Sequence, residues 1–257
     1  EMITGQNVVG NPYAPETIDP QVVKIAQNAA HYAVQKPDEV TDLVDFKQPE
    51  ISDTDLKAPI YIDFGPPSLS ATPWNNITSH QESSTTSWIK DVENNYTNIG
   101  VRVLDGFTAT HAGVGSEPAS PVTVDGVEFP LTAWKDGLLV KGEKNQGDVG
   151  PGRIEISQLD VARKYNFTIL AIRFNGSKDA RISSYKLVGK TESAVKEVKT
   201  GIKDAASFAA ANFEEYIAKF ENVEPDSEGK VIVEVKGLDT GSAAEGHINA
   251  LCISLAK

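Results

Sequence analysis

The sequence predicts a mainly β protein: a jelly-roll β-sandwich with an N-terminal helical arm. From residue 60 onward, short apolar segments alternate with a period of two, as in strands that bury one face. Turns rich in Gly, Pro, Asn and Asp separate about ten such segments, a spacing typical of sandwiches and jelly rolls. Only one segment, near the N-terminus, has a clear helical period.

That helical segment has recognisable ends. Asp19 is a typical N-cap residue, and Pro20 suits the first helical position. Apolar residues then recur at helical spacing until Lys36, and Pro37 ends the pattern. No second helix follows against which this one could pack. Its partner is therefore expected to lie outside the chain, unless the helix packs across the sandwich as a decoration.

Composition divides the chain into three parts. Residues 1–45 form the helical arm, and residues 46–59 form an acidic, proline-containing linker. Residues 60–257 form the sandwich. The expected order is therefore an arm, a linker and one β domain.

The predicted strands follow one another at short intervals. Residues 60–64 alternate cleanly, and Gly65 with two prolines ends them. Residues 165–174 are apolar on both faces over most of their length, which indicates a central strand. Between residues 204 and 220 the alanines favour helix and the surroundings favour a hairpin, so we expect strand from about Tyr216. The other predicted strands are residues 100–104, 122–129, 138–141, 154–159, 181–188, 194–202, 230–236 and 248–255.

The charge of the chain excludes several partners. Its 36 acidic and 24 basic residues give a formal net charge of −12. Such a charge repels nucleic acid and anionic membranes, and no apolar run reaches membrane-spanning length, so we expect no nucleic-acid partner and no membrane insertion. The single cysteine, Cys252, forms no internal disulfide and is expected to be buried in a strand. If the protein is exported, its signal peptide lies upstream of this chain.

No catalytic set is recognisable. A serine hydrolase needs a nucleophile on a tight turn, supported by His and Asp, and Gly-x-Ser-x-Gly is absent. No histidines show a zinc spacing such as His-Glu-x-x-His. Of the four histidines, His31 is assigned to packing in the helix and His247 to the start of the last strand. His80 and His111 fall in predicted loops, where they could contact a ligand.

A carbohydrate-binding surface fits the remaining aromatic and polar residues. Sugar-binding sandwiches stack aromatic rings on pyranose faces, and Asn, Asp and Arg bond the hydroxyl groups. Two tryptophans lie in predicted loops, and several polar residues flank the turn after the central strand. Each tryptophan could instead anchor the core or a loop. The predicted glycan-binding residues are Trp74, Asn75, Trp134, Arg173, Asn175 and Arg181.

Calcium is a candidate cofactor because hard oxygen ligands are plentiful. Asp63, Asp105, Asp239 and Glu245 are candidates because they lie near strand ends, and of these Asp63 and Glu245 are the predicted metal ligands. No EF-hand spacing accompanies them.

Several segments resemble a known kind of domain. The pieces Tyr61-Ile-Asp-Phe-Gly65, Trp74-Asn-Asn and His247-Ile-Asn-Ala-Leu251 are similar to the galactose-binding type of jelly-roll sandwich in exported proteins of Bacteroidetes. Residues 165–171 and 220–225 share the resemblance. It implies an exported bacterial protein, located in the periplasm, on the cell surface or outside the cell. In such proteins this module commonly follows a catalytic domain.

The arm resembles something different. Residues 29–33 and 37–42 are similar to the final helix of an SGNH-type hydrolase domain. In that family the catalytic Ser lies near the start of the domain and an Asp-x-x-His motif comes late, and neither is in this chain. His31 does not match the motif. The resemblance therefore implies an upstream catalytic domain that is missing here, and it transfers no catalytic residue.

Three hypotheses follow. The first is a non-catalytic accessory sandwich that binds glycan or braces an exported carbohydrate-active esterase or related hydrolase. The second is a hydrolase with an unrecognised site, for which paired carboxylates would need a defined separation. The third is a structural or adhesion domain without a small ligand.

Overall fold

The computed structural model describes residues 9, 18, 20–35, 56–66, 68–141, 151–174, 181–238 and 245–257. The chain divides into two compact units, residues 1–50 and 51–257, and each is described by itself. In the first unit, helix α1 spans Pro20–Gln35, so the predicted helix and its proline start are confirmed. Residues 46–55 of the predicted linker lie outside the described residues.

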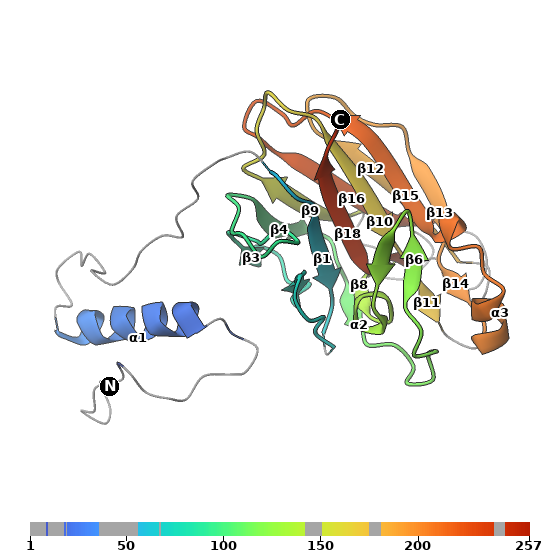
Figure 1. The fold of residues 1–257 in the computed structure, drawn as a ribbon, viewed down its shortest axis with the longest axis horizontal. Helices are drawn as coiled ribbons and strands as arrows, with labels where there is room; N and C mark the ends of the chain where they lie inside the picture. The colour runs from blue at the N-terminus through green and yellow to red at the C-terminus, as the bar shows by residue number, and fades with distance from the viewer. Residues whose placement is uncertain are drawn as a thin grey trace. The chain divides into compact units, whose positions relative to one another are not determined.

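The second unit is a β-sandwich of two main sheets (Figure 1), as the sequence predicted. One sheet has five strands in the order β15-β10-β18-β1-β2. All its neighbours are antiparallel except β1 and β2. Its strands are β15 (Ile217–Val223), β10 (Tyr165–Leu170), β18 (Ala250–Leu255), β1 (Ile60–Phe64) and β2 (Trp74–Ile77).

The facing sheet has six strands in the order β13-β12-β16-β9-β4-β3 and is antiparallel throughout. Its strands are β13 (Lys196–Lys199), β12 (Ile182–Val188), β16 (Val231–Gly237), β9 (Gly152–Ser157), β4 (Gly100–Asp105) and β3 (Thr85–Thr86). The neighbours β12–β16, β16–β9 and β9–β4 come from distant parts of the sequence, so the sandwich depends on long-range pairing.

Smaller elements close the sides of the sandwich. A three-stranded sheet has the order β17-β8-β5. Short helices and two strand pairs complete the unit. The bounds are β17 (Glu245–Ile248), β8 (Gly137–Lys141), β5 (Ala109–His111), β6 (Val122–Val124), β7 (Val127–Phe129), β11 (Arg173–Phe174), β14 (Gly201–Ile202), α2 (Leu131–Trp134), α3 (Ala205–Ala209) and η1 (Phe213–Tyr216).

Side-chain alternation places two apolar clusters on opposite faces of the five-stranded sheet. On β10, Phe167 and Ile169 point into the main core between the sheets, whereas Leu170 belongs to the second cluster on the outer face. The second cluster also contains residues of the β6–β7 hairpin, α2 and α3, which therefore cover part of that outer face. Polar residues Asn166 and Thr168 continue the same outer face beyond the cover. One end of the outer face is thus buried, and the other is open.

The structure corrects several boundaries. Trp74, expected in a loop, lies in strand β2, which pairs in parallel with β1. The expected strand over residues 165–174 is interrupted after Leu170 and resumes as β11. The expected last strand is split at Asn249 into β17 and β18. The ambiguous segment contains helix first and strand from Ile217, which confirms the predicted strand start near Tyr216 to within one residue.

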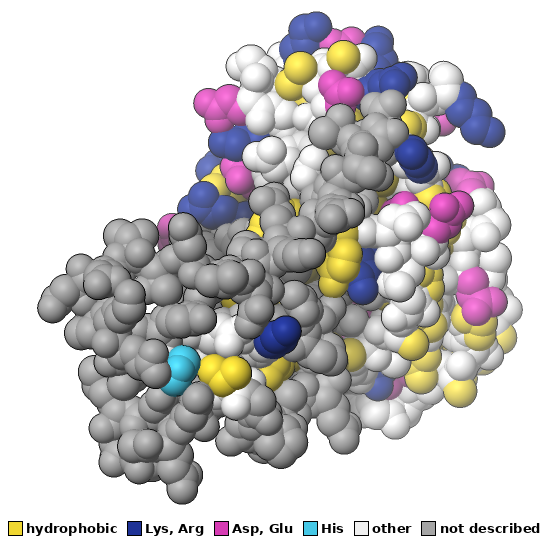
Figure 2. Space-filling view, turned by 60° about the vertical axis from the view of Figure 1, so that its left-hand side comes forward, with side chains coloured by type: hydrophobic (Ala, Val, Ile, Leu, Met, Phe, Trp, Pro, Cys, Tyr) yellow, Lys and Arg dark blue, Asp and Glu magenta, His cyan; other side chains and the backbone are white. Residues whose placement is uncertain are grey.

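The described surface is chemically mixed. On the face that Figure 2 shows, basic and acidic side chains of the sandwich lie next to one another rather than in separate patches. Within the described residues, no helix is both long and apolar enough to cross a membrane.

Candidate functional site

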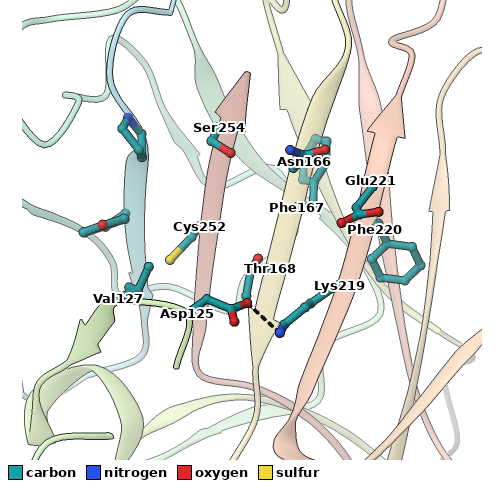
Figure 3. Close-up of a pocket in the computed structure, with 12 residues that line it drawn as sticks. Asp125, Val127, Asn166, Phe167, Thr168, Lys219, Phe220, Glu221, Cys252 and Ser254 are labelled. Carbon is teal, nitrogen blue, oxygen red and sulfur yellow. Dashed lines mark ion pairs between the residues drawn. The ribbon is translucent and has the colours of Figure 1, made fainter. Parts of the chain in front are cut away.

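The open end of the outer face holds a pocket with a volume of about 240 Å³. Cross-strand pairing builds its floor: Tyr61 pairs with Cys252, Cys252 with Thr168, and Thr168 with Lys219. One row of side chains therefore crosses four neighbouring strands (Figure 3). Asn166 and Ser254 form the next row on the same face. We call this feature the open-face pocket.

The β6–β7 hairpin forms one wall of the open-face pocket. Its turn residues Asp125 and Gly126 have φ values of 51° and 77°, the left-handed conformation that tight hairpin turns need. This turn places Asp125 beside the sheet, where its carboxylate pairs with Lys219 (Figure 3). Lys219 also pairs with Glu214 at 2.7 Å. The pocket therefore holds a lysine between two carboxylates, with its side chain 34% exposed.

Polar groups of the pocket have spare hydrogen-bonding capacity. The side-chain oxygen of Asn166 accepts from the backbone nitrogen of Asn222 at 3.0 Å, and its amide nitrogen has no partner among the described residues. Thr168 and Ser254 add hydroxyl groups. Tyr61 and Val127 supply apolar surface. The lining is thus part apolar and part polar, as a sugar ring requires.

Trp74 lies beside this pocket without being among its lining residues. Its ring is 5.1 Å from that of Tyr61 between centroids, and 5.6 Å from that of Phe129. Trp74 is half-buried and packs against the second apolar cluster. Its position supports the ring of Tyr61, which itself lines the pocket.

Asn75 is fully occupied in holding the backbone. Its amide nitrogen donates to the carbonyl oxygens of Tyr61 and Lys90 at 2.9 and 2.8 Å. Its amide oxygen accepts from the backbone nitrogen of Lys90 at 2.8 Å. These bonds fix the segment around Lys90 to the edge of the sheet, and they leave little capacity for a ligand.

Trp134 is a core residue. It is 0% exposed, and it stacks on Phe208 with centroids 4.9 Å apart. Its indole nitrogen donates to the carbonyl oxygen of Ser120 at 3.1 Å. No sugar can stack on a ring without exposed surface, so the expected role of Trp134 in glycan binding is replaced by packing in the core.

A second polar group, the arginine–histidine cluster, consists of His111, Arg173, Arg181, Glu245 and His247. The atom Nη1 of Arg173 lies 3.2 Å from Nδ1 of His111, whose ring meets that of His247 edge-on at 5.0 Å. Glu245 Oε2 lies 3.6 Å from His247 Nε2 and 3.2 Å from Arg181 Nη1. Three of the eight predicted site residues, Arg173, Arg181 and Glu245, therefore meet here. Asn175 lies outside the described residues.

The surroundings of the cluster depend on close backbone packing. A Cβ atom on Gly137 would lie 3.0 Å from His111 Nε2 and 2.5 Å from the carbonyl oxygen of Ile248. Glycine at this position therefore lets His111 pack over β8. The sequence predicted a loop at His111 and a strand start at His247. No motif or spacing in it indicated that the two rings would be in contact.

Burial and charge shift the pKa values of the cluster in consistent directions. Burial, followed by the charges of His247, Arg173 and Arg181, lowers the pKa of His111 well below its usual range. Burial also lowers the pKa of His247, although Glu245 opposes this. The nearby ring of His247, followed by the charge of Arg181, lowers the pKa of Glu245 to about 2, although burial opposes this. At neutral pH the cluster therefore holds two guanidinium groups, one carboxylate and two neutral imidazoles.

Asp63 lies apart from Glu245 and beside another buried carboxylate. Asp63 and Asp136 are both 0% exposed, and each has one oxygen, Oδ1, without a partner. Their other oxygens accept from the backbone nitrogens of Ser70 and Ser68, each at 3.1 Å. Burial raises the pKa of Asp63 to about 8 and that of Asp136 to about 6. Sequence analysis did not identify Asp136.

The two predicted metal ligands thus have different environments. Glu245 lies beside the guanidinium group of Arg181 and the imidazole of His247, and Arg181 balances its negative charge. Within the described ranges, no group of three or more His, Cys, Asp or Glu residues is placed to hold a metal ion. Asp239 lies outside those ranges, and Asp105 pairs with Arg153 at 3.2 Å.

Comparisons with known proteins give only remote likenesses. No protein-family model and no curated protein matches the chain. Among solved structures, it is similar to TmCBM61 in complex with β-1,4-galactotriose, with a TM-score of 0.26, 16% identity, and coverage of 47% of this chain and 71% of that one.

It is also similar to the ANX2 ectodomain from Arabidopsis thaliana, with a TM-score of 0.41, 9% identity, and coverage of 68% of this chain and 48% of that one. The ANXUR1 extracellular domain from the same plant gives a TM-score of 0.40, 10% identity, and coverage of 69% and 47%. The chain therefore spans about half the length of these two plant structures. At such TM-scores the function has to be argued from the geometry of this chain.

Proposed function

We propose that the sandwich is a non-catalytic carbohydrate-binding domain that holds a neutral sugar in the open-face pocket. The observation that supports this most is the row of side chains from Tyr61 to Lys219 across four strands. A rigid sheet fixes their spacing, so the site is formed before a ligand arrives. Preorganised sites lose less entropy on binding.

The chemistry of the pocket suits a saccharide. A sugar ring has an apolar face and a rim of hydroxyl groups that both donate and accept hydrogen bonds. Tyr61 offers ring surface, while Asn166, Thr168 and Lys219 offer donors and acceptors. Pockets for drug-sized ligands usually measure about 300–1,000 Å³. This smaller pocket suits one ring of a glycan, with the rest of the glycan along the sheet.

Catalysis is not part of this proposal. Cys252 is the most nucleophilic residue type in the lining. Burial raises the pKa of its thiol, which keeps the thiol protonated and unreactive at neutral pH. No histidine lines the pocket to activate it. The groups present can bind and orient a sugar, but they form no nucleophile–base pair.

We further propose that the domain is an accessory part of an exported hydrolase. The support is the resemblance of residues 29–33 and 37–42 to the end of an SGNH-type domain. The helical part of that segment, α1, is present as expected, and residues 37–42 lie outside the described residues. Detection of an esterase domain encoded directly upstream would support this placement, and its absence would contradict it.

A glycan array tests the carbohydrate proposal. The full chain is applied to neutral oligosaccharides, including β-1,4-galactotriose, with calcium and again with chelator, and hits are titrated by calorimetry. We expect selective binding with Kd between about 1 μM and 1 mM, which corresponds to about −8 to −4 kcal/mol. A blank array in both conditions would contradict the proposal and favour a bracing domain.

A matched pair of lysine variants locates the binding. Lys219 and Lys230 are each 34% exposed and each form two ion pairs, but only Lys219 lines the pocket. We expect Lys219→Ala to weaken glycan binding about tenfold, a change of about 1.4 kcal/mol. Lys230→Ala should leave it unchanged. Equal effects of the two variants in calorimetry would place the ligand elsewhere.

A further inference from the structure

The arginine–histidine cluster is separate from the open-face pocket and has a different composition. Its members come from four segments: β5 supplies His111, β11 supplies Arg173, and β17 supplies His247 and Glu245. Arg181 immediately precedes β12. None of the five lines the open-face pocket. Folding thus brings two guanidinium groups together at a second place, and the sugar proposal does not use it.

Several buried nitrogens of the cluster have no hydrogen-bond partner. Nine buried side-chain atoms of the described residues have no partner, and six of them belong to this cluster: His111 Nε2, Arg173 Nε, Arg181 Nε and Nη1, and both ring nitrogens of His247. Arg181 Nη1 lies near Glu245 without hydrogen-bond geometry. Buried polar groups in proteins are nearly always paired. Three of these six atoms belong to arginines, whose nitrogens only donate, so the partner missing there is an acceptor.

The cluster also lacks negative charge. Two arginines stay charged, because guanidinium groups are not deprotonated in proteins, and they face one carboxylate, Glu245. The next carboxylate, Glu117, is occupied by the backbone nitrogens of Val114 and Gly115. The two arginines and Glu245 therefore carry a net charge of about +1.

The cluster is reachable from solvent at two members. Arg173 is half-exposed, and the side chain of Glu245 is 25% exposed, whereas Arg181 is 5% exposed. A ligand group that enters between the arginines would meet partly buried donors, where charge-assisted hydrogen bonds are stronger than at the surface.

We propose that the arginine–histidine cluster binds an oxyanion, such as a carboxylate, through Arg173 and Arg181. A carboxylate matches the planar donors of a guanidinium group and supplies the acceptors that the cluster lacks. It also balances the excess positive charge. The oxyanion can come from an acidic sugar or from a small inorganic ion, and the two sources share this chemistry.

Paired probes distinguish the two sources. The full chain is titrated by calorimetry at constant ionic strength with glucuronate, with glucose and with sulfate. Glucuronate and glucose differ at the carboxylate group, so binding of glucuronate alone assigns the cluster to an acidic sugar. Binding of sulfate alone assigns it to an inorganic oxyanion, and binding of both assigns it to the oxyanion in general. Failure of both anions to bind would overturn the proposal.

Arginine variants then locate the site. Arg173→Gln removes the charge but keeps a polar side chain at a partly exposed position, and it should weaken anion binding at least about tenfold. Arg153→Gln is the control, because Arg153 on β9 pairs with Asp105 on β4 and with Glu234 on β16, and neither carboxylate belongs to the cluster. Arg181→Gln is a second variant, interpreted only if its melting curve matches wild type. Anion binding unchanged in Arg173→Gln would overturn the proposal.

This outcome is independent of the sugar-binding proposal. Neutral glycans at the open-face pocket should respond to Lys219→Ala and not to Arg173→Gln. Oxyanions should show the reverse pattern. Loss of one activity therefore leaves the other measurable.

Discussion

At the scale of single residues, burial changes the behaviour of several acidic groups. Asp63 is 0% exposed and has one oxygen without a partner, so the folded state favours its neutral form. The side chain of Glu245 is 25% exposed and lies beside a guanidinium group, so the folded state favours its charged form. The two predicted metal ligands therefore contribute to stability with opposite dependence on pH.

The Asp63 carboxyl group makes the protein less stable as pH rises. Its folded pKa, about 8, exceeds the model value of 3.8, so the folded state holds the proton more tightly. The contribution is complete below about pH 4 and is lost as pH rises toward 8. Asp63→Asn should therefore raise the free energy of unfolding at pH 8 relative to wild type, and less so at pH 5. Urea denaturation in chelator measures this.

A calcium ion bound at Asp63 would reverse the predicted effect of Asp63→Asn on stability. If Asp63 and Asp136 hold a cation, Asp63→Asn would destabilise the protein at pH 8 in calcium, and chelator would lower the wild-type melting temperature. Those results would contradict the account of a neutral, buried Asp63 and would support the calcium prediction made from sequence.

The Glu245 carboxylate stabilises the folded state above its own pKa. Its pKa is lowered from 4.5 to about 2, so this stabilisation is present above about pH 4.5 and is lost as pH falls toward 2. Glu245→Gln removes the carboxylate that faces Arg181, and it should cost about 1–3 kcal/mol at pH 7 and far less near pH 2. Chemical denaturation across this range is the measurement. Glu192→Gln, at a 66% exposed ion pair, is the control and should have little effect.

At the scale of elements, the sequence predicted the strong strands better than the short ones. Strands such as β1 and β16 have an uninterrupted alternation of buried apolar residues, which sequence shows directly. The edge strand β2 is Trp-Asn-Asn-Ile, and asparagines have low strand propensity, so its parallel pairing with β1 could not be foreseen. Short elements depend on tertiary contacts rather than on their own pattern.

The end of the outer face that α2, α3 and the β6–β7 hairpin cover shows the same limit of prediction from sequence. Trp134 precedes Lys135 and Asp136, and this polar context predicted a loop. In the structure, α2 places the Trp134 ring within the second apolar cluster. Trp134→Ala should therefore destabilise the protein by about 3–5 kcal/mol, as for other buried aromatic side chains. Thermal and urea unfolding measure this cost. Loss of glycan binding by a Trp134→Ala protein with wild-type stability would contradict the structural role.

At the scale of the whole molecule, the sandwich class was predictable and the arrangement of its sites was not. Turn residues and periodicity fix which residues point inward, and the described residues from 60 onward are mainly β, as the predicted fold class required. The sites depend on which strands become neighbours. Tyr61, Thr168 and Lys219 are far apart in sequence and form one row only because β1, β18, β10 and β15 pair in that order.

The same pairing decides which of the predicted site residues lie close together. Arg173, Arg181 and Glu245 were selected for charge and position near turns, and the fold brings them together. Nothing in the sequence indicates that His111 and His247 would join them, because the three-stranded β17-β8-β5 sheet combines distant segments. The sequence shows which residues carry charged or hydrogen-bonding groups, but it does not show which of them lie close together in the fold.

The most direct test of the central claim is a crystal structure of the chain with its strongest neutral glycan from the array. The account predicts a sugar ring against Tyr61 in the open-face pocket, with hydroxyl groups within hydrogen-bond distance of Thr168, Asn166 or Lys219. A sugar bound at any other surface, with the open-face pocket empty, would contradict it.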